Sequence, residues 1–376
     1  MIKNKNDYDV IILGGGVAGC ATALSLRHRG IEKILIVEAD DYKQIRIGES
    51  LPPDACQLLN QLGLWTDFLK EGHEACLGSC SSWGDDALGY NDFLCNPYGN
   101  GWHLDRRRFD AFIARKTVES GIRFQTHTRF IDASPLKMGG FSLRFHTENN
   151  TQQNITSRFV VDATGKIGRF ARQQGAKRLF VDQLAFISVF CDKPKTNTFP
   201  QLTYLEAVEQ GWWYAASLPD NQLVISMATE PETLRAQGLL HIQEWLKQLY
   251  NTRHLAQQLE GCQFKNENLI ISVAPSFQLN KTSGKDWLAV GDAASCYDPI
   301  SSQGIYKALS DGVHAAQSIT DYLNLKEESA LDNYHFFISH CFDDYLNNRN
   351  YFYQLENRWS TSHFWRNRQT RTALPI

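Results

Sequence analysis

The chain has 376 residues, of which 43% are hydrophobic and 21% are charged, so it has enough apolar material for one large elaborated domain or two ordinary ones. Its 38 Lys and Arg residues against 41 Asp and Glu residues give a formal net charge of −3, which excludes recruitment of nucleic acid or an anionic membrane by a strong basic field. Nine scattered cysteines, with no further Cys or His pair to complete a site beside Cys76 and Cys80, predict reduced thiols in a cytoplasmic protein and no metal site.

The first predicted elements form a strand, a helix and a second strand. The apolar run at residues 9–13 is typical of a buried parallel strand, residues 21–29 indicate a helix, and residues 33–37 indicate the next strand. The uncharged run over residues 10–26 is interrupted by three consecutive glycines, which makes it a poor membrane span.

Three glycines stand between the first strand and the helix, at positions 14, 16 and 19, and an acid, Glu38, ends the second strand. This order predicts a dinucleotide-binding unit. Gly14 permits a tight turn, and Gly16, with Val17 and Ala18 after it, lets the helix N-terminus approach a pyrophosphate. Gly19 lets helix and strand pack closely, and Glu38 is expected to accept hydrogen bonds from a ribose.

Five further segments decide which dinucleotide is expected. They are RIGESLPP at residues 46–53, DRRRFD at 105–110, FVVDATG at 159–165, WLAVGDAA at 287–294 and DPISSQGI at 298–305. In this order they resemble the single-component FAD-dependent monooxygenase superfamily, which also contains flavin-dependent halogenases and geranylgeranyl reductases. The resemblance implies FAD as the cofactor and an α/β, Rossmann-like FAD-binding fold of the aromatic-hydroxylase type, with an inserted antiparallel substrate sheet and C-terminal helices.

The resemblance also implies which further residues contact FAD. Arg106 is expected to reach its phosphates or ribitol, Asp292 to accept from the ribitol chain, and Arg46 or Ser50 to lie near the isoalloxazine ring. The remaining expected contacts are Glu49, Asp162, Gly165, Gly291, Pro299, Gln303, Gly304 and Ile305.

The pattern changes after about residue 184. Short aromatic-rich runs at residues 186–190, 202–207, 211–218 and 223–227 predict antiparallel strands, followed by a helical stretch over 239–259. The expected division is an FAD-binding domain of residues 1–75, 100–183 and 272–330, a substrate domain of residues 76–99 and 184–271, and a C-terminal helical segment of residues 331–376.

Halogenase features are missing from the segments that should carry them. Residues 77–84 contain no lysine, the run GWWYAASLP does not match the halogenase Trp-x-Trp-x-Ile-Pro motif, and Ser301 stands where an acidic residue is expected. We therefore predict a monooxygenase in which a flavin C4a-hydroperoxide transfers an OH group to an electron-rich aromatic ring. Candidate acid–base residues are Asp298, Tyr297 and His103, each of which could equally serve packing or turn formation.

Within the superfamily, the segments GESLPP, GSCSSWG and DPISSQGI resemble flavoproteins required for the biogenesis of cysteine tryptophylquinone in amino-acid oxidases. This resemblance implies that the substrate is a tryptophan of a precursor oxidase protein, with molecular oxygen and transient NAD(P)H or another reductant as co-reactants, and with no nucleic-acid or membrane partner. The alternatives are a hydroxylase of a small aromatic metabolite, a flavin-dependent alkene reductase, and a non-catalytic chaperone that binds the precursor.

Two aromatic features complete the expectations. Trp83, Trp102, Trp212 and Trp213 are expected around the flavin, where they would hold an aromatic guest. Residues 346–376 carry five arginines, at positions 349, 358, 366, 368 and 371, interleaved with aromatic residues. This tail is either a helix packed on the FAD-binding domain with solvated arginines or a docking patch for an acidic partner protein.

Overall fold

The first sheet is built on the apolar N-terminal strand. The computed structural model describes residues 7–149, 151–193, 199–264 and 269–369. The central strands are parallel, with Val10 of β1 paired to both Ile34 and Phe159, and their side chains are almost fully buried. The strand order is β17-β18-β11-β1-β2-β8, with β10 paired to β11 and β9 paired to β10. The strands are β1 (Tyr8–Leu13), β2 (Ile34–Val37), β8 (Arg123–Gln125), β9 (Arg129–Pro135), β10 (Phe141–His146), β11 (Gln152–Asp162), β17 (Ser283–Gly284) and β18 (Trp287–Ala289).

Two helices pack closely together beside this sheet. They are α1 (Val17–His28) and α9 (Gly304–Thr320). Gly312 of α9 makes the approach possible, because an added Cβ would lie 2.7 Å from the Cβ of Ala21 and 2.8 Å from the amide nitrogen of Thr22. The other helices on this part of the molecule are α2 (Ala55–Gln61), α3 (Trp65–Phe68), α4 (Arg106–Glu119) and α5 (Arg169–Gln173).

The second sheet has the order β19-β16-β12-β15-β14-β13-β5-β6. Its strands are β5 (Gly78–Ser82), β6 (Gly89–Asp92), β12 (Arg178–Asp192), β13 (Thr203–Val208), β14 (Gly211–Leu218), β15 (Gln222–Thr229), β16 (Ile270–Leu279) and β19 (Ser295–Cys296). A small third sheet joins β3 (Ser50–Leu51), β7 (Gly101–His103) and β4 (Glu74–Cys76). The predicted α/β fold is confirmed, and the second sheet is antiparallel as expected except where β5 pairs with β13 in parallel.

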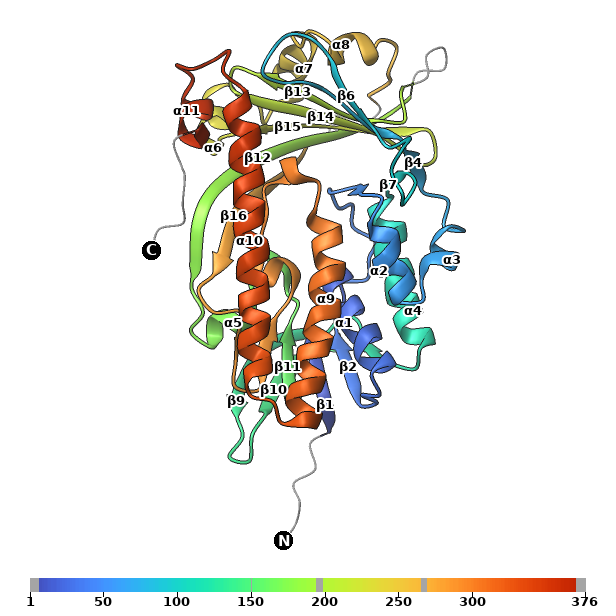
Figure 1. Ribbon diagram of the computed structural model, residues 1–376, viewed down its shortest axis with the longest axis vertical. Helices are drawn as coiled ribbons and strands as arrows, with labels where there is room; N and C mark the ends of the chain where they lie inside the picture. The colour runs from blue at the N-terminus through green and yellow to red at the C-terminus, as the bar shows by residue number, and fades with distance from the viewer. Residues whose placement is uncertain (1–6, 150, 194–198, 265–268, 370–376) are drawn as a thin grey trace.

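Helices cover both faces of the second sheet (Figure 1). The outer face, away from the first sheet, carries α6 (Pro231–Ala236), α7 (Ile242–Tyr250) and α8 (Leu255–Gln258). The helical stretch predicted over residues 239–259 is thus divided into two helices, α7 and α8. The carboxylate of Glu206 accepts hydrogen bonds from the amides of Arg253 and Leu255, at 2.6 and 2.7 Å, and so starts a new helix there.

The inner face of the second sheet meets the C-terminal helices. The long helix α10 (Ser329–Leu355) runs beside α9 from the first sheet to the second, and α11 (His363–Gln369) lies against the second sheet (Figure 1). Within the described ranges, no helix is both long and apolar enough to cross a membrane. On its inner face, the second sheet packs against the C-terminal helices and against the turn η3 (Pro299–Ser301), which precedes α9.

Candidate functional site

The glycine loop after β1 has the geometry that its motif predicts. Gly14 has a φ of +112°, and an added Cβ would lie 2.2 Å from the carbonyl oxygen of Ala163. A Cβ on Gly19 would lie 2.0 Å from the carbonyl oxygen of Gly14, whereas one on Gly16 would meet nothing within 4 Å. Gly14 and Gly19 are thus required by close packing, while Gly16 leaves open space where a phosphate can approach the N-terminus of α1.

Glu38, the acid at the end of β2, is buried beside this loop. Its Oε2 accepts a hydrogen bond from the amide of Gly15 at 2.6 Å, and its Oε1 accepts from the amide of Asp40 at 2.9 Å. The carboxylate therefore fixes the loop from the side on which a ribose is expected. Its contact with a ribose stays a prediction.

Asp292 follows β18, next to the glycine loop. Its neighbour Gly291 has a φ of +59°, and a Cβ there would lie 2.7 Å from the Cβ of Ala18. The amide of Gly291 donates to Oδ2 of Asp311 at 3.1 Å, and this oxygen also lies 3.0 Å from Nζ of Lys307. Both members of this ion pair are buried, whereas Asp292 is exposed and free to bind a ligand.

The buried ion pair between Lys307 and Asp311 was not predicted from the sequence. Their i,i+4 spacing in the helix after the 298–305 segment was the available signal, since this spacing places oppositely charged side chains side by side.

Arg106, at the start of α4, is near enough to Asp292 for the two charges to interact. Its Nε and Nη2 each donate to Asp110 at 3.2 Å, and its Nη1 donates to the carbonyl of Gly48 at 2.9 Å. Burial disfavours the charged guanidinium, but the carboxylates of Asp110, Glu49 and Asp292 together outweigh this effect, and the pKa of Arg106 is raised. Arg46 also donates to Asp110, at 3.2 Å. The structure thus brings both predicted arginines together on one buried carboxylate.

Asp162, at the end of β11, acts on its own loop. Its Oδ1 accepts from the amide and hydroxyl of Thr164, at 3.0 and 2.6 Å, and its Oδ2 accepts from the amide of Ala171 at 2.7 Å. Burial raises the pKa of Asp162. Because both oxygens are occupied, Asp162 shapes the turn at Gly165, whose φ is +63°. Direct contact of either residue with FAD stays a prediction.

The segment that contains Pro299, Gln303, Gly304 and Ile305 is held by Asp298. Its Oδ1 accepts from the amide of Ile300 at 3.0 Å and so caps the turn η3. Its Oδ2 accepts from the hydroxyl of Tyr353 at 2.8 Å and from Nε of Arg349 at 3.3 Å. Asp298 is therefore an anchor between the turn and α10.

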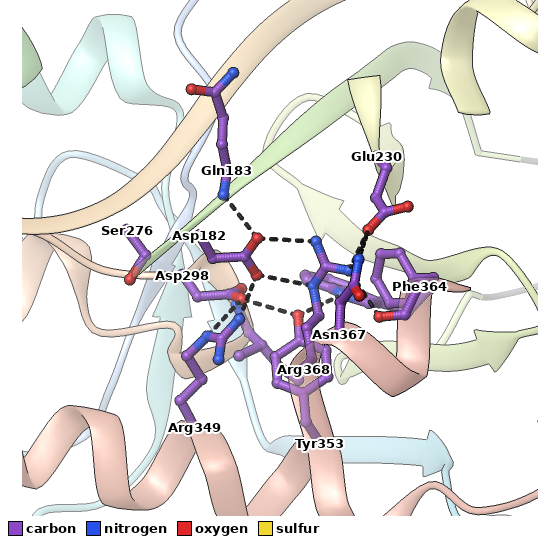
Figure 2. Close-up of polar contacts among 12 residues, drawn as sticks. Asp182, Gln183, Glu230, Ser276, Asp298, Arg349, Tyr353, Phe364, Asn367 and Arg368 are labelled. Atoms are coloured by element: carbon purple, nitrogen blue, oxygen red, sulfur yellow. Dashed lines mark hydrogen bonds and ion pairs between the residues drawn. The ribbon is translucent and has the colours of Figure 1, made fainter. Parts of the chain in front are cut away.

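Asp298 belongs to a buried charged cluster, which we define as Asp182, Glu230, Asp298, Arg349 and Arg368 (Figure 2). Arg349 pairs with Asp182 and Asp298, while Arg368 of α11 lies 2.8 Å from Asp182 and 3.2 Å from Glu230. The expectation of solvated tail arginines is wrong for Arg349 and Arg368, because carboxylates from the second sheet and η3 neutralise them in the interior.

The aromatic residues of the tail are divided between the interior and the surface, where Tyr351 and Phe352 are 58% and 44% exposed. Phe364 and Trp365 of α11 are buried on the inner face of the second sheet, rather than on the first sheet as expected. They are not available as docking residues. Arg371 lies outside the described residues.

The three candidate acid–base residues do not converge. Tyr297 stacks on Tyr345 of α10, with ring centroids 4.1 Å apart. His103 is fully buried in β7, where its Nε2 lies 2.9 Å from Oγ1 of Thr203, and burial lowers its pKa to about 4. In the part of the chain that the structure describes, no hydrogen bond joins His103 to Tyr297 or Asp298. A catalytic role for each of the three stays a prediction.

A different polar group lies near a cavity between residues 45–49, the start of α4 and the second sheet. The cavity of about 240 Å³ is lined by residues that include Arg46, Glu49, Arg106 and Leu218. The hydroxyl of Tyr214 on β14 lies 3.1 Å from Oγ of Ser50 and donates to Oε2 of Glu49 at 3.4 Å. Sequence reasoning did not single out Tyr214, since nothing local indicates that β14 would meet residues 164 and 165 positions away.

Trp212 and Trp213 lie on opposite faces of the second sheet. Trp212 packs against Trp83 and Phe186 on the inner face, whereas Trp213 packs against Trp245 of α7 on the outer face. The expected place of Trp213 near the flavin is wrong, because successive residues of a strand point to opposite sides. Trp102 is also packed elsewhere, against Trp65 and Phe68.

The residues present fit FAD. A glycine cradle lies open at the N-terminus of α1, the exposed Asp292 lies beside it, and Arg106 lines a cavity. Among the described residues, no group of three or more His, Cys, Asp and Glu side chains could hold a metal ion.

Comparison with known proteins agrees with this geometry. Residues 7–337 match the FAD binding domain family, and the chain belongs to it. It is 28% identical over 98% of both chains to the putative FAD-dependent oxidoreductase LodB of Marinomonas mediterranea. FAD is therefore the cofactor, and the protein is an FAD-dependent oxidoreductase, as the resemblance implied.

Two solved structures share the fold. One is the myxobacterial chondrochloren halogenase CndH, with 21% identity, a TM-score of 0.89 and coverage of 98% of this chain and 87% of that one. The other is the peptidyl tryptophan dihydroxylase QhpG, with 20% identity, a TM-score of 0.78 and coverage of 98% and 81%. Halogenases and hydroxylases thus both occur among the neighbours.

Proposed function

We propose that the protein is an FAD-dependent monooxygenase that hydroxylates an aromatic ring, and that its substrate is a tryptophan side chain of a precursor oxidase protein. One observation carries the proposal: the turn η3 faces an aromatic surface. Ile300 of η3 packs in the same cluster as Trp212 and Tyr214 of the second sheet. Trp212 and Tyr214 are buried, so an indole ring would bind at the edge of this cluster, beside the cavity lined by Glu49 and Leu218, where the ring of Tyr214 is suited to aromatic packing.

The chain's own residues would prepare this site for oxygen chemistry. Bound and reduced FAD supplies the activation of molecular oxygen. Asp298 and Arg349 fix η3 through buried hydrogen bonds, so that Ile300 keeps its place under the aromatic surface. The same buried packing limits the access of water, which favours transfer of oxygen to the substrate over wasteful side reactions.

The polar side chains of β5 favour hydroxylation over halogenation. Ser79 and Ser81 pair with Thr203 and Leu205, so they lie on the same face of the second sheet as Leu205, which packs in the inner aromatic cluster. β5 thus carries serine hydroxyl groups in the segment where a halogenase is expected to carry a lysine.

The choice of a protein substrate draws on QhpG, whose description names a peptidyl substrate. QhpG is described as a peptidyl tryptophan dihydroxylase essential for tryptophylquinone cofactor biogenesis, and LodB as an FAD-dependent oxidoreductase. The present chain matches both along nearly its whole length. A tryptophan in a polypeptide is therefore the aromatic substrate that we favour over a free metabolite.

The test is coexpression of a precursor oxidase with this protein, followed by intact-mass measurement and peptide mapping of the precursor. We expect the mass of one or two oxygen atoms to be gained on a tryptophan, with the label retained when ¹⁸O₂ is supplied. The variant Asp292→Ala is the matched control, since it should lose FAD and leave the precursor unmodified.

Three outcomes would overturn the proposal. A halogen mass in bromide-containing medium would make the protein a halogenase. An unmodified precursor that still copurifies with the protein would indicate a chaperone. Oxygen transfer to free indoles or phenols, with the precursor unchanged, would indicate a hydroxylase of small metabolites.

A further inference from the structure

We propose that the unpaired edge of β16, together with a group of cations beside it, binds an extended acidic segment of the precursor protein as an added β-strand. The inference rests on the proposed function in one respect, since it takes the precursor as the occupant of this edge. It concerns the docking of that protein and not the chemical step.

One edge of β16 has no partner strand over most of its length. β16 pairs with β12 along residues 270–279, but β19 covers its other edge only at Phe277 and Gln278. No other strand among the described residues joins the second sheet at that edge. Residues 270–276 therefore lie at an edge to which a further strand can be added.

The backbone groups that point away from β12 belong to alternate residues of β16. The amide of Leu279 donates to a carbonyl just before β19 at 2.9 Å, and the carbonyl of Val273 accepts from Nζ of Lys166 at 2.8 Å. Since alternate residues of a strand direct their N–H and C=O groups to the same edge, both groups of Ile271 and the N–H of Val273 point there as well. Pro275, which has no N–H to lose, stands in the same series, as edge strands permit. The unpaired groups of Ile271 and Val273 are those that an extended peptide uses when it adds to a sheet.

The side chains at this edge are apolar and exposed. Ile271 and Val273 are 47% and 44% exposed, although both are β-branched residues that pack well in sheets. An apolar edge strand is prone to pair with another chain. The charge of Lys166 at the carbonyl of Val273 disfavours the pairing of two copies of this protein, because each copy would bring its own cations to the contact. The edge is therefore suited to a segment of different charge.

The cations beside Val273 supply that preference. They are Lys166, Arg169, Arg172 and Arg178. Arg178 donates to the carbonyls of Lys166 and Ile167, while Arg169 and Arg172 are exposed and lie three residues apart on α5. None of the four forms an ion pair with a carboxylate in the part of the chain that the structure describes. Burial, and then the charge of Arg172, lower the pKa of Arg178. The group therefore favours an anionic partner.

The edge also leads toward the cavity at the second sheet. Ile270 pairs with Ser188 of β12, and β12 continues for two residues to Phe190, which lines the cavity. Two residues of a strand span about 7 Å. A segment added at this edge would thus have one end at the cations and the other near the cavity beside which we place the substrate tryptophan.

The experiment measures the binding of a purified precursor oxidase to the holoenzyme by calorimetry, together with hydrogen–deuterium exchange. We expect the precursor to slow the exchange of peptides covering residues 269–276, and added salt to weaken binding. Arg169→Glu combined with Arg172→Glu should weaken binding by about 10–100-fold, because like charges then meet. Ile271→Pro removes an N–H that is not part of the ladder with β12, and should weaken binding by about 3–10-fold.

A second pair of charge reversals is the matched control. Lys33→Glu combined with Arg123→Glu changes the net charge equally, and both residues are exposed at the first sheet, beside β2 and in β8. This variant should bind the precursor as the wild type does.

Several outcomes would overturn the inference. They are a precursor that does not bind, binding that is unchanged by the reversals at Arg169 and Arg172 or reduced equally by the control pair, and exchange protection that excludes residues 269–276. Protection of these residues in the protein alone at high concentration would show that a second copy occupies the edge, and would overturn it too. If Ile271→Pro does not fold, the charge reversals and the exchange protection decide.

Failure of the proposed function is seen separately. A precursor that binds at this edge and is recovered without added oxygen would contradict hydroxylation and leave the docking intact. A precursor that gains oxygen without protection of residues 269–276 would contradict the docking and leave hydroxylation intact.

Discussion

The two faces of the second sheet are buried to a similar degree but by different chemistry. On the outer face, Trp213, Trp245 and Leu249 belong to an apolar cluster covered by α6, α7 and α8. On the inner face, the aromatic residues Trp212 and Trp365 lie beside the buried charged cluster that reaches Asp298 and η3. The outer face can only contribute stability, whereas the inner face also fixes the position of the turn before α9.

The comparison predicts the largest effect for a change within the buried charged cluster. Arg349→Met should lower the free energy of unfolding by about 3–5 kcal/mol, because it leaves Asp298 buried without a cation and Asp182 with Arg368 alone. FAD affinity should fall as well, since η3 loses an anchor. Chemical denaturation and FAD titration measure the two effects. The exposed Arg115→Met should change neither by a comparable amount, and a similar loss in both variants would contradict the prediction.

A smaller loss is expected on the outer face. Trp245→Ala removes a fully buried ring that packs on Trp213 at a centroid distance of 5.0 Å. We expect a decrease of about 3 kcal/mol, at the lower end of the range for such changes. The reason is that the indole N–H of Trp245 has no hydrogen-bond partner among the described residues, so its removal costs no hydrogen bond. The folded variant should bind FAD with wild-type affinity, and a weakened affinity would show that the two faces are not independent.

The smallest effect is expected at the solvent side of α7. Lys247 lies 3.6 Å from Glu244, and its side chain is 67% exposed. Lys247→Ala should change the free energy of unfolding by about 0.5 kcal/mol or less, because exposed ion pairs contribute little. The same denaturation series measures it. A loss comparable to that of Trp245→Ala would mean that α7 is held by its charges and not by its apolar side.

The sequence predicted those parts of the site that are contiguous in the chain. The glycine loop before α1 and the strand β14 (Gly211–Leu218) occupy the expected residues, because turn geometry and the apolar run are local properties. The face to which each side chain of β14 points could not be predicted in this way. All eight of its residues are buried, so no alternation of polar and apolar residues distinguishes Trp212 from Trp213.

The partners of the buried charged residues could not be predicted from the sequence either. Arg349 and Arg368 are part of a basic, aromatic tail in the sequence, where hydration is the natural expectation. Their carboxylate partners stand 51 to 186 positions away, on β12, after β15 and before η3. Only the packing of α10 and α11 against the second sheet brings them together.

The sequence by itself determined the cofactor class and the α/β fold, because glycine spacing, a βαβ unit and ordered motifs act over short distances. The tertiary structure decided which charges are buried, which tryptophans meet the site, and that Arg46 and Arg106 share the buried carboxylate of Asp110. The physical reason is that burial and ionic partnership are properties of the folded interior. A residue's own neighbours in the chain do not supply them.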